Sequence, residues 1–128
     1  MIYLDSSVAL ASVFAEARQP PPRFWLQPFV SSRLLEFEMM NRIHTRRLIG
    51  AQIAAAKVLI AGVMFIDLTQ PVLARALQPF PLAVRTLDGL HLATMDFLRN
   101  QGQLIELASY DQRLLAAAAA LGFSAASI

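Results

Sequence analysis

Short apolar runs alternate with longer, mostly apolar stretches along the chain, which is the pattern of strands followed by helices. The first run has β-branched and aromatic side chains and suits a strand that is buried on both faces, as in a parallel sheet. Similar runs recur downstream, and the last of them is a weaker candidate for an edge strand. The predicted strands are residues 2–4, 29–30, 63–68, 104–108 and 123–128.

The stretches between these runs end at residues that stop helices. Prolines 20–22 close the first stretch, and glycines close several later ones. The long stretch that ends near Leu48 is apolar around much of its circumference, so we expect a largely buried helix that forms an antiparallel pair with the next one. The expected capping residues are Ser31 or Ser32, Thr86, and Ser109 or Asp111. The predicted helices are residues 8–17, one turn within 23–28, then 33–48, 51–61, 69–77, 87–100 and 112–121.

Strands that alternate with helices indicate an α/β fold with a mostly parallel central sheet. The 128 residues contain no internal repeat and no segment with the composition of a linker. We therefore expect one domain, residues 1–128, which is large enough to bury a hydrophobic core.

The composition is apolar for a water-exposed domain, with 56% hydrophobic and 16% charged residues. The longest apolar run, residues 58–66, is too short to span a bilayer, and no basic segment precedes an apolar core at the amino terminus, so neither a membrane span nor a signal peptide is expected. The absence of cysteine excludes disulfides and thiolate metal sites and fits a cytoplasmic protein. The high apolar fraction favours a homo-oligomer or a buried partner surface.

The formal net charge is only +2, but its distribution is uneven. Residues 1–64 carry seven basic and four acidic side chains, whereas residues 65–128 carry four basic and five acidic ones. All but one of the basic residues are arginines, which favour bidentate contacts with phosphate. This distribution is compatible with a polyanionic substrate and equally with an ordinary solvated surface.

Three aspartates recur at or near the starts of predicted helices. Asp5 follows the first strand, Asp88 lies in the first turn of a later helix, and Asp111 lies at the start of the last one. Each could simply cap its helix. In a parallel sheet, however, these turns open on one edge, so the carboxylates could converge around a divalent cation such as Mg²⁺ or Mn²⁺.

A fourth carboxylate is expected from the long helix, and the choices are Glu36 and Glu38. Two positions along a helix differ by about 200°, so only one of them can face the site. An acid on a nearly all-apolar helix needs a partner, because burying it unpaired is costly. Solvent exposure is the simpler interpretation for Glu36.

Four segments together resemble PIN-domain proteins, and more closely the VapC-type toxin ribonucleases of bacterial toxin–antitoxin pairs. The most specific is Arg-Thr-Leu-Asp-Gly-Leu-His-Leu-Ala-Thr at residues 85–94, and the similarity covers most of the chain in the family's order. Gly89 in place of a common alanine and the prolines at 20–22 depart from the family pattern without removing an acid. The segments are residues 3–7, 32–38, 85–94 and 109–114.

This resemblance implies a three-layer PIN-like fold and a metal-dependent endoribonuclease that hydrolyses RNA with a metal-activated water. It also implies a homodimer and a small VapB-like antitoxin that blocks the site. The serine-to-glutamate spacing within the family motif selects Glu38 over Glu36. The implied catalytic and metal-binding residues are Asp5, Glu38, Asp88 and Asp111, with Ser6 and Ser109 in support and Arg42, Arg46, Arg85 and Arg113 as candidate RNA contacts.

Other interpretations carry less weight. A catalytically silent module of the same fold that binds RNA or protein is the main alternative, and a phosphatase-like hydrolase is disfavoured because Ser7 stands where a second aspartate is needed. No serine has the partners of a Ser-His-Asp hydrolase, and there is no phosphate-binding glycine motif. His91 shares a helix face with Asp88, which could suit a metal pair, but with one histidine and no cysteine nearby a hydrogen-bonded core residue is the favoured interpretation. The remaining assignments are His44 on a basic surface, Asp67 and Asp96 as surface or capping residues, and Phe24, Trp25 and Phe29 as core or partner contacts.

Overall fold

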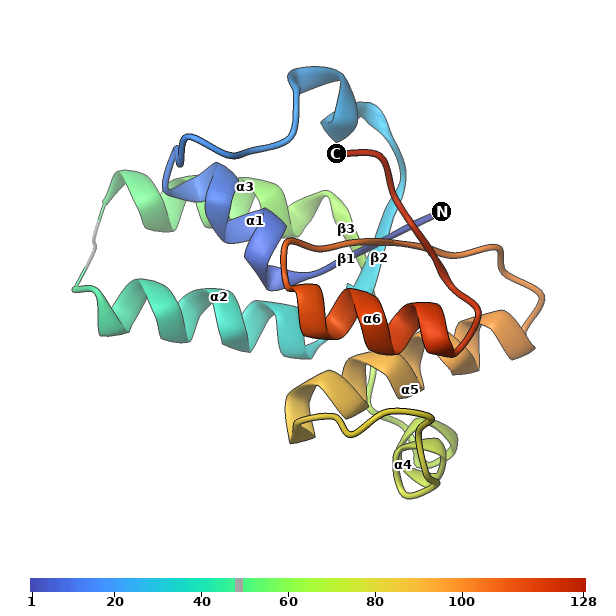
Figure 1. Cartoon of the computed structure of the whole chain (residues 1–128). Coiled ribbons are helices and arrows are strands. Elements are labelled where there is room, and N and C mark those ends of the chain that lie inside the picture. Colours follow the sequence, from blue (N-terminus) through green and yellow to red (C-terminus); the bar gives the residue numbers. More distant parts are fainter. Residues whose placement is uncertain (48–49) are drawn as a thin grey trace.

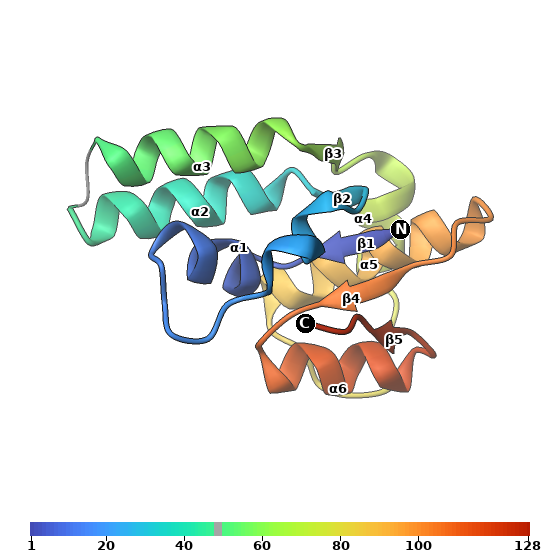
Figure 2. The same cartoon turned by 90° about the horizontal axis from the view of Figure 1, so that it is seen from above.

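The computed structural model describes residues 1–47 and 50–128, and within them a parallel sheet lies between layers of helices (Figures 1 and 2). The first strand of the chain is the central one, and every neighbouring pair of strands is parallel, which confirms the expected α/β class. Across the sheet the strands are β3 (Val63–Ile66), β2 (Phe29–Ser32), β1 (Ile2–Leu4), β4 (Glu106–Ala108) and β5 (Ser124–Ala125).

Successive side chains of β1 point to opposite faces of the sheet, and the hydrophobic core has one part on each face. Ile2 and Leu4 pack on one face with side chains of α1, α2 and α3, whereas Tyr3 packs on the other face with side chains of α5 and α6. In Figure 1, α4 lies outside α5. The helices are α1 (Ser6–Val13), α2 (Leu34–Thr45), α3 (Ala51–Ala61), α4 (Gln70–Ala76), α5 (Thr86–Asn100) and α6 (Gln112–Ala120), with a 3₁₀ turn η1 (Pro22–Leu26) before β2.

Helix α1 differs from the prediction at both ends. It begins two residues earlier, because the Asp5 side chain accepts the backbone N–H of Ser7 and caps the helix. It ends at Val13, well before the prolines, in a Schellman motif in which Ala15 adopts a left-handed φ of 50°. The predicted extension to residue 17 is therefore wrong, since a non-glycine residue provides the turn that usually requires glycine.

Helix α2 is amphipathic, and the expectation that it is largely buried is wrong. Leu35, Met39 and Ile43 form one buried stripe at intervals of four, whereas Phe37 is 61% exposed. The helix ends at Thr45, and the predicted end near Leu48 lies outside the described residues. The antiparallel pairing of α2 with α3 is confirmed, and the two helices lie side by side in both views (Figures 1 and 2).

Several boundaries follow from local hydrogen bonds. Ser31 and Ser32 belong to β2. The Ser32 hydroxyl accepts the N–H of Leu34, which is the first residue of α2. Thr86 is the first residue of α5 and not its cap, whereas Asp111 caps α6 as expected. Strands β3 and β4 are two residues shorter than predicted. In the described residues, no helix is long and apolar enough to cross a membrane.

Asp96 on α5 is buried, at 8% exposure, and not on the surface as expected. Its two carboxylate oxygens accept hydrogen bonds from Arg75 of α4 and Arg99 of α5. Burial alone would raise the pKa of Asp96, but the two arginines outweigh it and hold the pKa below its ordinary value. This ion-paired carboxylate ties α4 to α5.

We expect Asp96→Asn to lower the free energy of unfolding at pH 7 by about 2 kcal/mol, between the costs of breaking exposed and buried ion pairs. Because the folded-state pKa is depressed, this contribution is present above the unfolded-state pKa of about 4 and is lost as the pH falls through the folded value. Urea unfolding at pH 7 and pH 3 measures the difference. Asp67→Asn, which breaks an exposed pair with Arg33, is the control and should cost less than about 1 kcal/mol. An equal penalty for Asp96→Asn at both pH values would contradict an ionic origin.

Candidate active site

The four predicted acids line one hollow at the carboxyl edge of the sheet. Asp5 follows β1, Glu38 comes from α2, Asp88 lies in the first turn of α5 and Asp111 caps α6. The hollow has a volume of about 530 Å³. Its other lining residues are Ser6, Ser7, Leu10, Arg42, Arg85, Thr86 and Leu87.

Asp5 is the most buried of the four acids, at 5% exposure. Its Oδ2 accepts the backbone N–H and the hydroxyl of Ser7 and, at 2.8 Å, the hydroxyl of Ser109. All three donors reach the same oxygen, and among the described residues none hydrogen-bonds to Oδ1. The carboxylate is thus fixed in orientation while one oxygen remains for a ligand.

Two hydroxyls join the loop after β4 to the start of α1. The Ser109 hydroxyl accepts the N–H of Asp111 at 3.0 Å while it donates to Asp5. The Ser7 hydroxyl accepts the N–H of Tyr110 at 2.9 Å while it also donates to Asp5. The sequence analysis named Ser7 only as the residue in place of a second aspartate and missed its contact with Asp5, although its place two residues after Asp5 was the available signal.

Glu38 and Glu36 point to different surroundings, as their spacing requires. Glu38 accepts the Ser6 hydroxyl on Oε2 at 2.9 Å and is hydrogen-bonded to His91 through Oε1. Glu36 instead pairs with Arg33, outside the hollow. The structure therefore brings Glu38, and not Glu36, next to the other acids.

Arg85 connects Asp88 and Asp111. Its Nε donates to Asp88 at 3.2 Å and its Nη2 donates to Asp111 at 3.0 Å. The hydrogen bond with Asp88 is the main cause of a raised pKa of Arg85, which stays charged. One exposed guanidinium thus balances part of the charge of two carboxylates that would otherwise repel each other.

His91 is a buried, hydrogen-bonded residue, as predicted, but it also reaches the site. Its ring lies between the Tyr3 hydroxyl and the Glu38 carboxylate. Burial lowers the pKa of His91, but the hydrogen bond and charge of Glu38 outweigh burial and raise it overall. The contact with Glu38 was missed in the sequence, although His91 lies three residues after Asp88 on the same face of α5.

The donor set fits a hard divalent cation. Asp5, Glu38 and His91 each bring one ligand atom, and these atoms lie within 4.8 Å of one another. The hollow holds four carboxylates against two arginines, so its lining has an excess of negative charge. Oxygen-rich sites of this kind suit Mg²⁺ or Mn²⁺.

The candidate RNA-contacting arginines are not all at the hollow. Arg42 and Arg85 line it. Arg113 is exposed and lines a neighbouring hollow that it shares with Asp88 and Arg85. Arg46 lies at the far end of α2, with its guanidinium 4.5 Å from the centre of the Phe14 ring.

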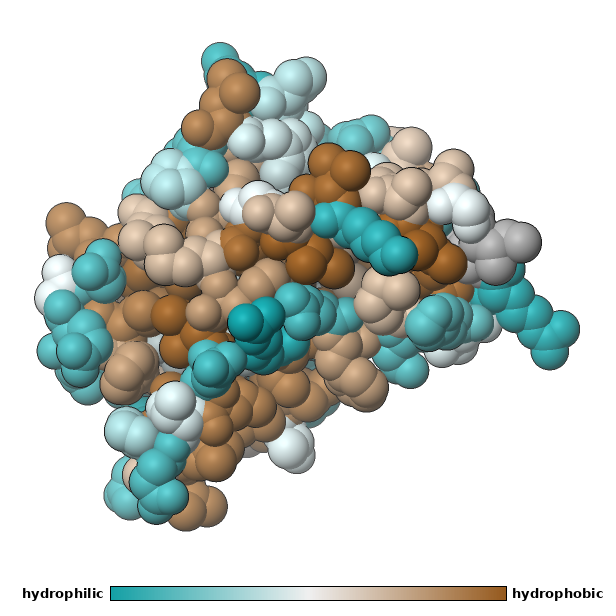
Figure 3. Space-filling view, turned by 180° about the vertical axis from the view of Figure 1, so that it is seen from behind, coloured by the Kyte–Doolittle hydropathy of each residue, from teal (hydrophilic) through white to brown (hydrophobic). Residues whose placement is uncertain are grey.

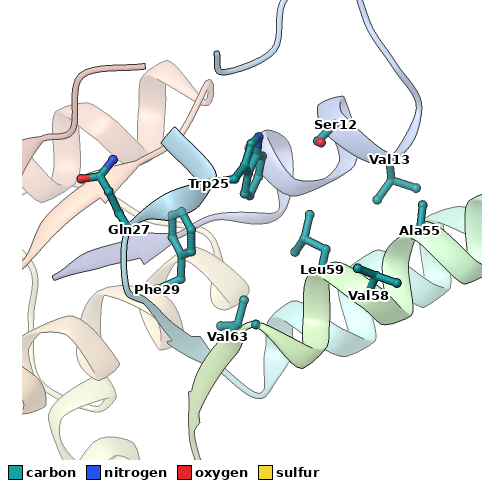
Figure 4. Close-up of a pocket in the computed structure, with 10 residues that line it drawn as sticks. Ser12, Val13, Trp25, Gln27, Phe29, Ala55, Val58, Leu59 and Val63 are labelled. Atoms are coloured by element: carbon teal, nitrogen blue, oxygen red, sulfur yellow. The ribbon is translucent and has the colours of Figure 1, made fainter. Parts of the chain in front are cut away.

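A second, apolar hollow of about 470 Å³ lies between α1, α3 and the start of β2 (Figure 4). Trp25, Phe29 and Leu59 line it, and Phe24, Trp25 and Phe29 form a cluster of aromatic rings. None of the four acids lines this hollow. It is a candidate partner surface, separate from the acidic one.

Comparisons with known proteins find relatives among toxin ribonucleases. No protein-family model matches the chain. The chain is 31% identical to Ribonuclease VapC47 of Mycobacterium tuberculosis, over 99% of its own length and 96% of that protein. Its fold is similar to that of M. tuberculosis VapC20, described as a sarcin-ricin loop cleaving toxin, with a TM-score of 0.72, 20% identity and complete coverage of both chains. It is also similar to a chain of a toxin-antitoxin complex from Klebsiella pneumoniae, with a TM-score of 0.62, 17% identity and 91% coverage of each chain.

Proposed function

Because this chain belongs to the VapC family of PIN-domain toxin ribonucleases, we propose that Asp5, Glu38, Asp88 and Asp111 form its catalytic site and hold Mg²⁺ or Mn²⁺. The observation that carries the proposal is the convergence of these acids, from four separate elements, on one hollow. We further propose that residues 1–128 work as one domain, because β1 and β4 both deliver acids to this hollow.

In this proposal, serines of the chain orient the carboxylates that would hold the cation. Hydrogen bonds from Ser7 and Ser109 hold Asp5, and Ser6 holds Glu38, so that both carboxylates face the hollow in fixed orientations. A divalent cation bound there would supply Lewis acidity, which lowers the pKa of water and stabilises charge on the phosphate oxygens.

Arginines at the rim would bind the RNA backbone. Arg42 and Arg85 line the acidic hollow and could contact phosphates on either side of the cleaved bond. Arg113, beside the hollow, extends this basic rim. Arg46 is further along α2, so we assign it a contact with more distant nucleotides.

RNA cleavage by the purified chain is expected to require Mg²⁺ or Mn²⁺, with EDTA lowering the rate by at least about 100-fold and added Mn²⁺ restoring it. A suitable panel contains single-stranded RNA, hairpins and a sarcin-ricin loop, since the fold relative VapC20 is described as cleaving that loop. Initial rates on each RNA, with and without chelator, are the measurement. Ca²⁺ added at the same ionic strength controls for screening of charge.

Cleavage that EDTA leaves unchanged would contradict the metal mechanism. Metal-independent binding of RNA without cleavage of any substrate in the panel would instead favour the catalytically silent module.

A small VapB-like antitoxin is the partner that the family implies, and we propose that it covers the acidic hollow. The apolar hollow around Trp25 and Leu59 offers a second anchoring surface for it.

We also propose a homodimer, because large apolar side chains are exposed on several elements and brown apolar surface is extensive on the face in Figure 3. We also propose that the chain acts in the cytoplasm, on the RNA substrate proposed above. The exposed apolar residues on which the homodimer proposal rests are Val58, Met64, Leu73, Leu77, Leu82 and Leu87.

A further inference from the structure

In the described part of the chain, His91 is the one imidazole that hydrogen-bonds an acid of the hollow, and its role there is not that of a core residue alone. It is 1% exposed, lies one turn after Asp88 on α5, and joins Tyr3 of β1 to Glu38 of α2. We propose that His91 is a positioning residue that donates a hydrogen bond from Nε2 and holds the Glu38 carboxylate in its metal-binding orientation. The proposal rests on the proposed function, because it concerns the same site.

The Tyr3 hydroxyl determines which imidazole nitrogen carries the proton. A phenolic hydroxyl keeps its proton at neutral pH and can therefore act as a donor. Its oxygen accepts the backbone N–H of Ser32 at 3.1 Å, and its proton is then available to His91 Nδ1 at 2.8 Å. A neutral imidazole that accepts at Nδ1 must carry its hydrogen on Nε2, which faces Glu38. In the imidazolium form Nε2 carries a hydrogen as well, so the donor to Glu38 is present in both states.

Glu38 needs such a donor more than the other acids do. Asp5 and Asp111 are short side chains that receive backbone N–H groups at helix starts. Glu38 lies within α2, has three rotatable bonds, and is held by one hydroxyl from Ser6 and one N–H from His91. Each donor occupies a different carboxylate oxygen, so the two together fix its plane. Ordering a flexible carboxylate in advance removes part of the entropy cost of binding a cation.

A proton on Nε2 also means that this nitrogen is not a metal ligand. Its distance from the Asp5 and Glu38 oxygens would otherwise permit direct coordination. A hydrogen-bond donor to Glu38 and a direct metal ligand make opposite predictions for the replacement of His91 by glutamine. Its amide nitrogen reaches the place of Nε2 and can donate to Glu38, but it is a poor replacement for an imidazole ligand.

Three variants separate the roles, with Mn²⁺ affinity measured by calorimetry and kcat and KM measured on a cleaved RNA. His91→Leu should weaken Mn²⁺ binding by about 10- to 100-fold and lower kcat with little change in KM for RNA. His91→Gln should recover most of the Mn²⁺ affinity. Leu92→Ala, at the next and equally buried position, controls for loss of packing and should lower the melting temperature without changing Mn²⁺ affinity.

A measurement on the wild-type chain keeps the test independent of how the variants fold. In ¹⁵N-histidine-labelled protein, the Nε2–H signal of His91 should persist when the site is saturated with diamagnetic Mg²⁺. Loss of that proton, or a His91→Gln variant as weak as His91→Leu, would assign His91 as a ligand and overturn the proposal. Unchanged Mn²⁺ affinity in His91→Leu would overturn it too. Wild-type protein that binds no Mn²⁺ would instead count against the proposed function itself.

Discussion

Replacement of Asp5, Asp88 or Asp111 by asparagine, one at a time, is expected to lower RNA cleavage by at least about 100-fold while the metal-free fold stays intact. Asparagine caps a helix about as well as aspartate, so α1 and α6 should keep their starts. A neutral amide is a poorer ligand for a hard cation. If the aspartates were helix caps and nothing more, the same substitutions would cost little activity.

The effect on stability should differ among the three variants. Asp5 is the one buried member of the four acids, and Asp5→Asn removes its charge from beside the others, so the metal-free protein should be as stable as wild type or more so. Asp88→Asn and Asp111→Asn each lose a pair with the exposed Arg85, which is worth less than about 1 kcal/mol.

Thermal melting with and without Mn²⁺ tests the shared site. A cation at about 100 times its dissociation constant should stabilise wild type by about 2.7 kcal/mol, and each variant by clearly less. Asp67→Asn, outside the hollow, is the matched control and should respond as wild type does. The same metal response in wild type and in all three variants would show that the aspartates do not form one site.

Glu38→Gln is expected to lose cleavage by about 100-fold, whereas Glu36→Gln should stay within about twofold of wild type. Both substitutions are isosteric and lie on the same helix, so α2 should tolerate them equally. Glu38 lines the hollow with the other acids, while Glu36 pairs with Arg33 at the surface. The measurement is the initial rate on one cleaved RNA, with circular dichroism to verify folding. Equal losses in two folded variants would contradict the assignment of Glu38.

Local signals in the sequence were enough to predict much of the fold. Gly50 and Gly62 mark the bounds of α3 correctly, because a glycine at each end interrupts an apolar and alanine-rich stretch. The expected edge strand is β5, and the expected turn before β2 is η1. The convergence of Asp5, Asp88 and Asp111 could be anticipated because parallel strands share one carboxyl edge.

One local turn and two sets of long-range contacts account for what the sequence did not reveal. The Schellman motif at Ala15 has no glycine to signal it, so the end of α1 was misplaced. Asp96 is buried because Arg75 comes from a separate helix, and spacing within α5 alone could not show this. The Tyr3–His91–Glu38 chain connects three elements, and its members become neighbours only after the sheet has formed.

The central place of β1 has a consequence for when the protein could become harmful to the cell that makes it. Asp5 is synthesised at the beginning, but Ser109, which orients it, is 104 residues away and is synthesised near the end. Strand β4, which pairs with β1, and Asp111, which caps α6, are also synthesised late. An unfinished nascent chain that lacks them has three of the four acids and lacks the β4 side of the sheet. Translation itself therefore delays assembly of the proposed site, and chains that terminate before β4 should be harmless by-products. Such a delay would give the proposed antitoxin time to meet each new chain as it leaves the ribosome.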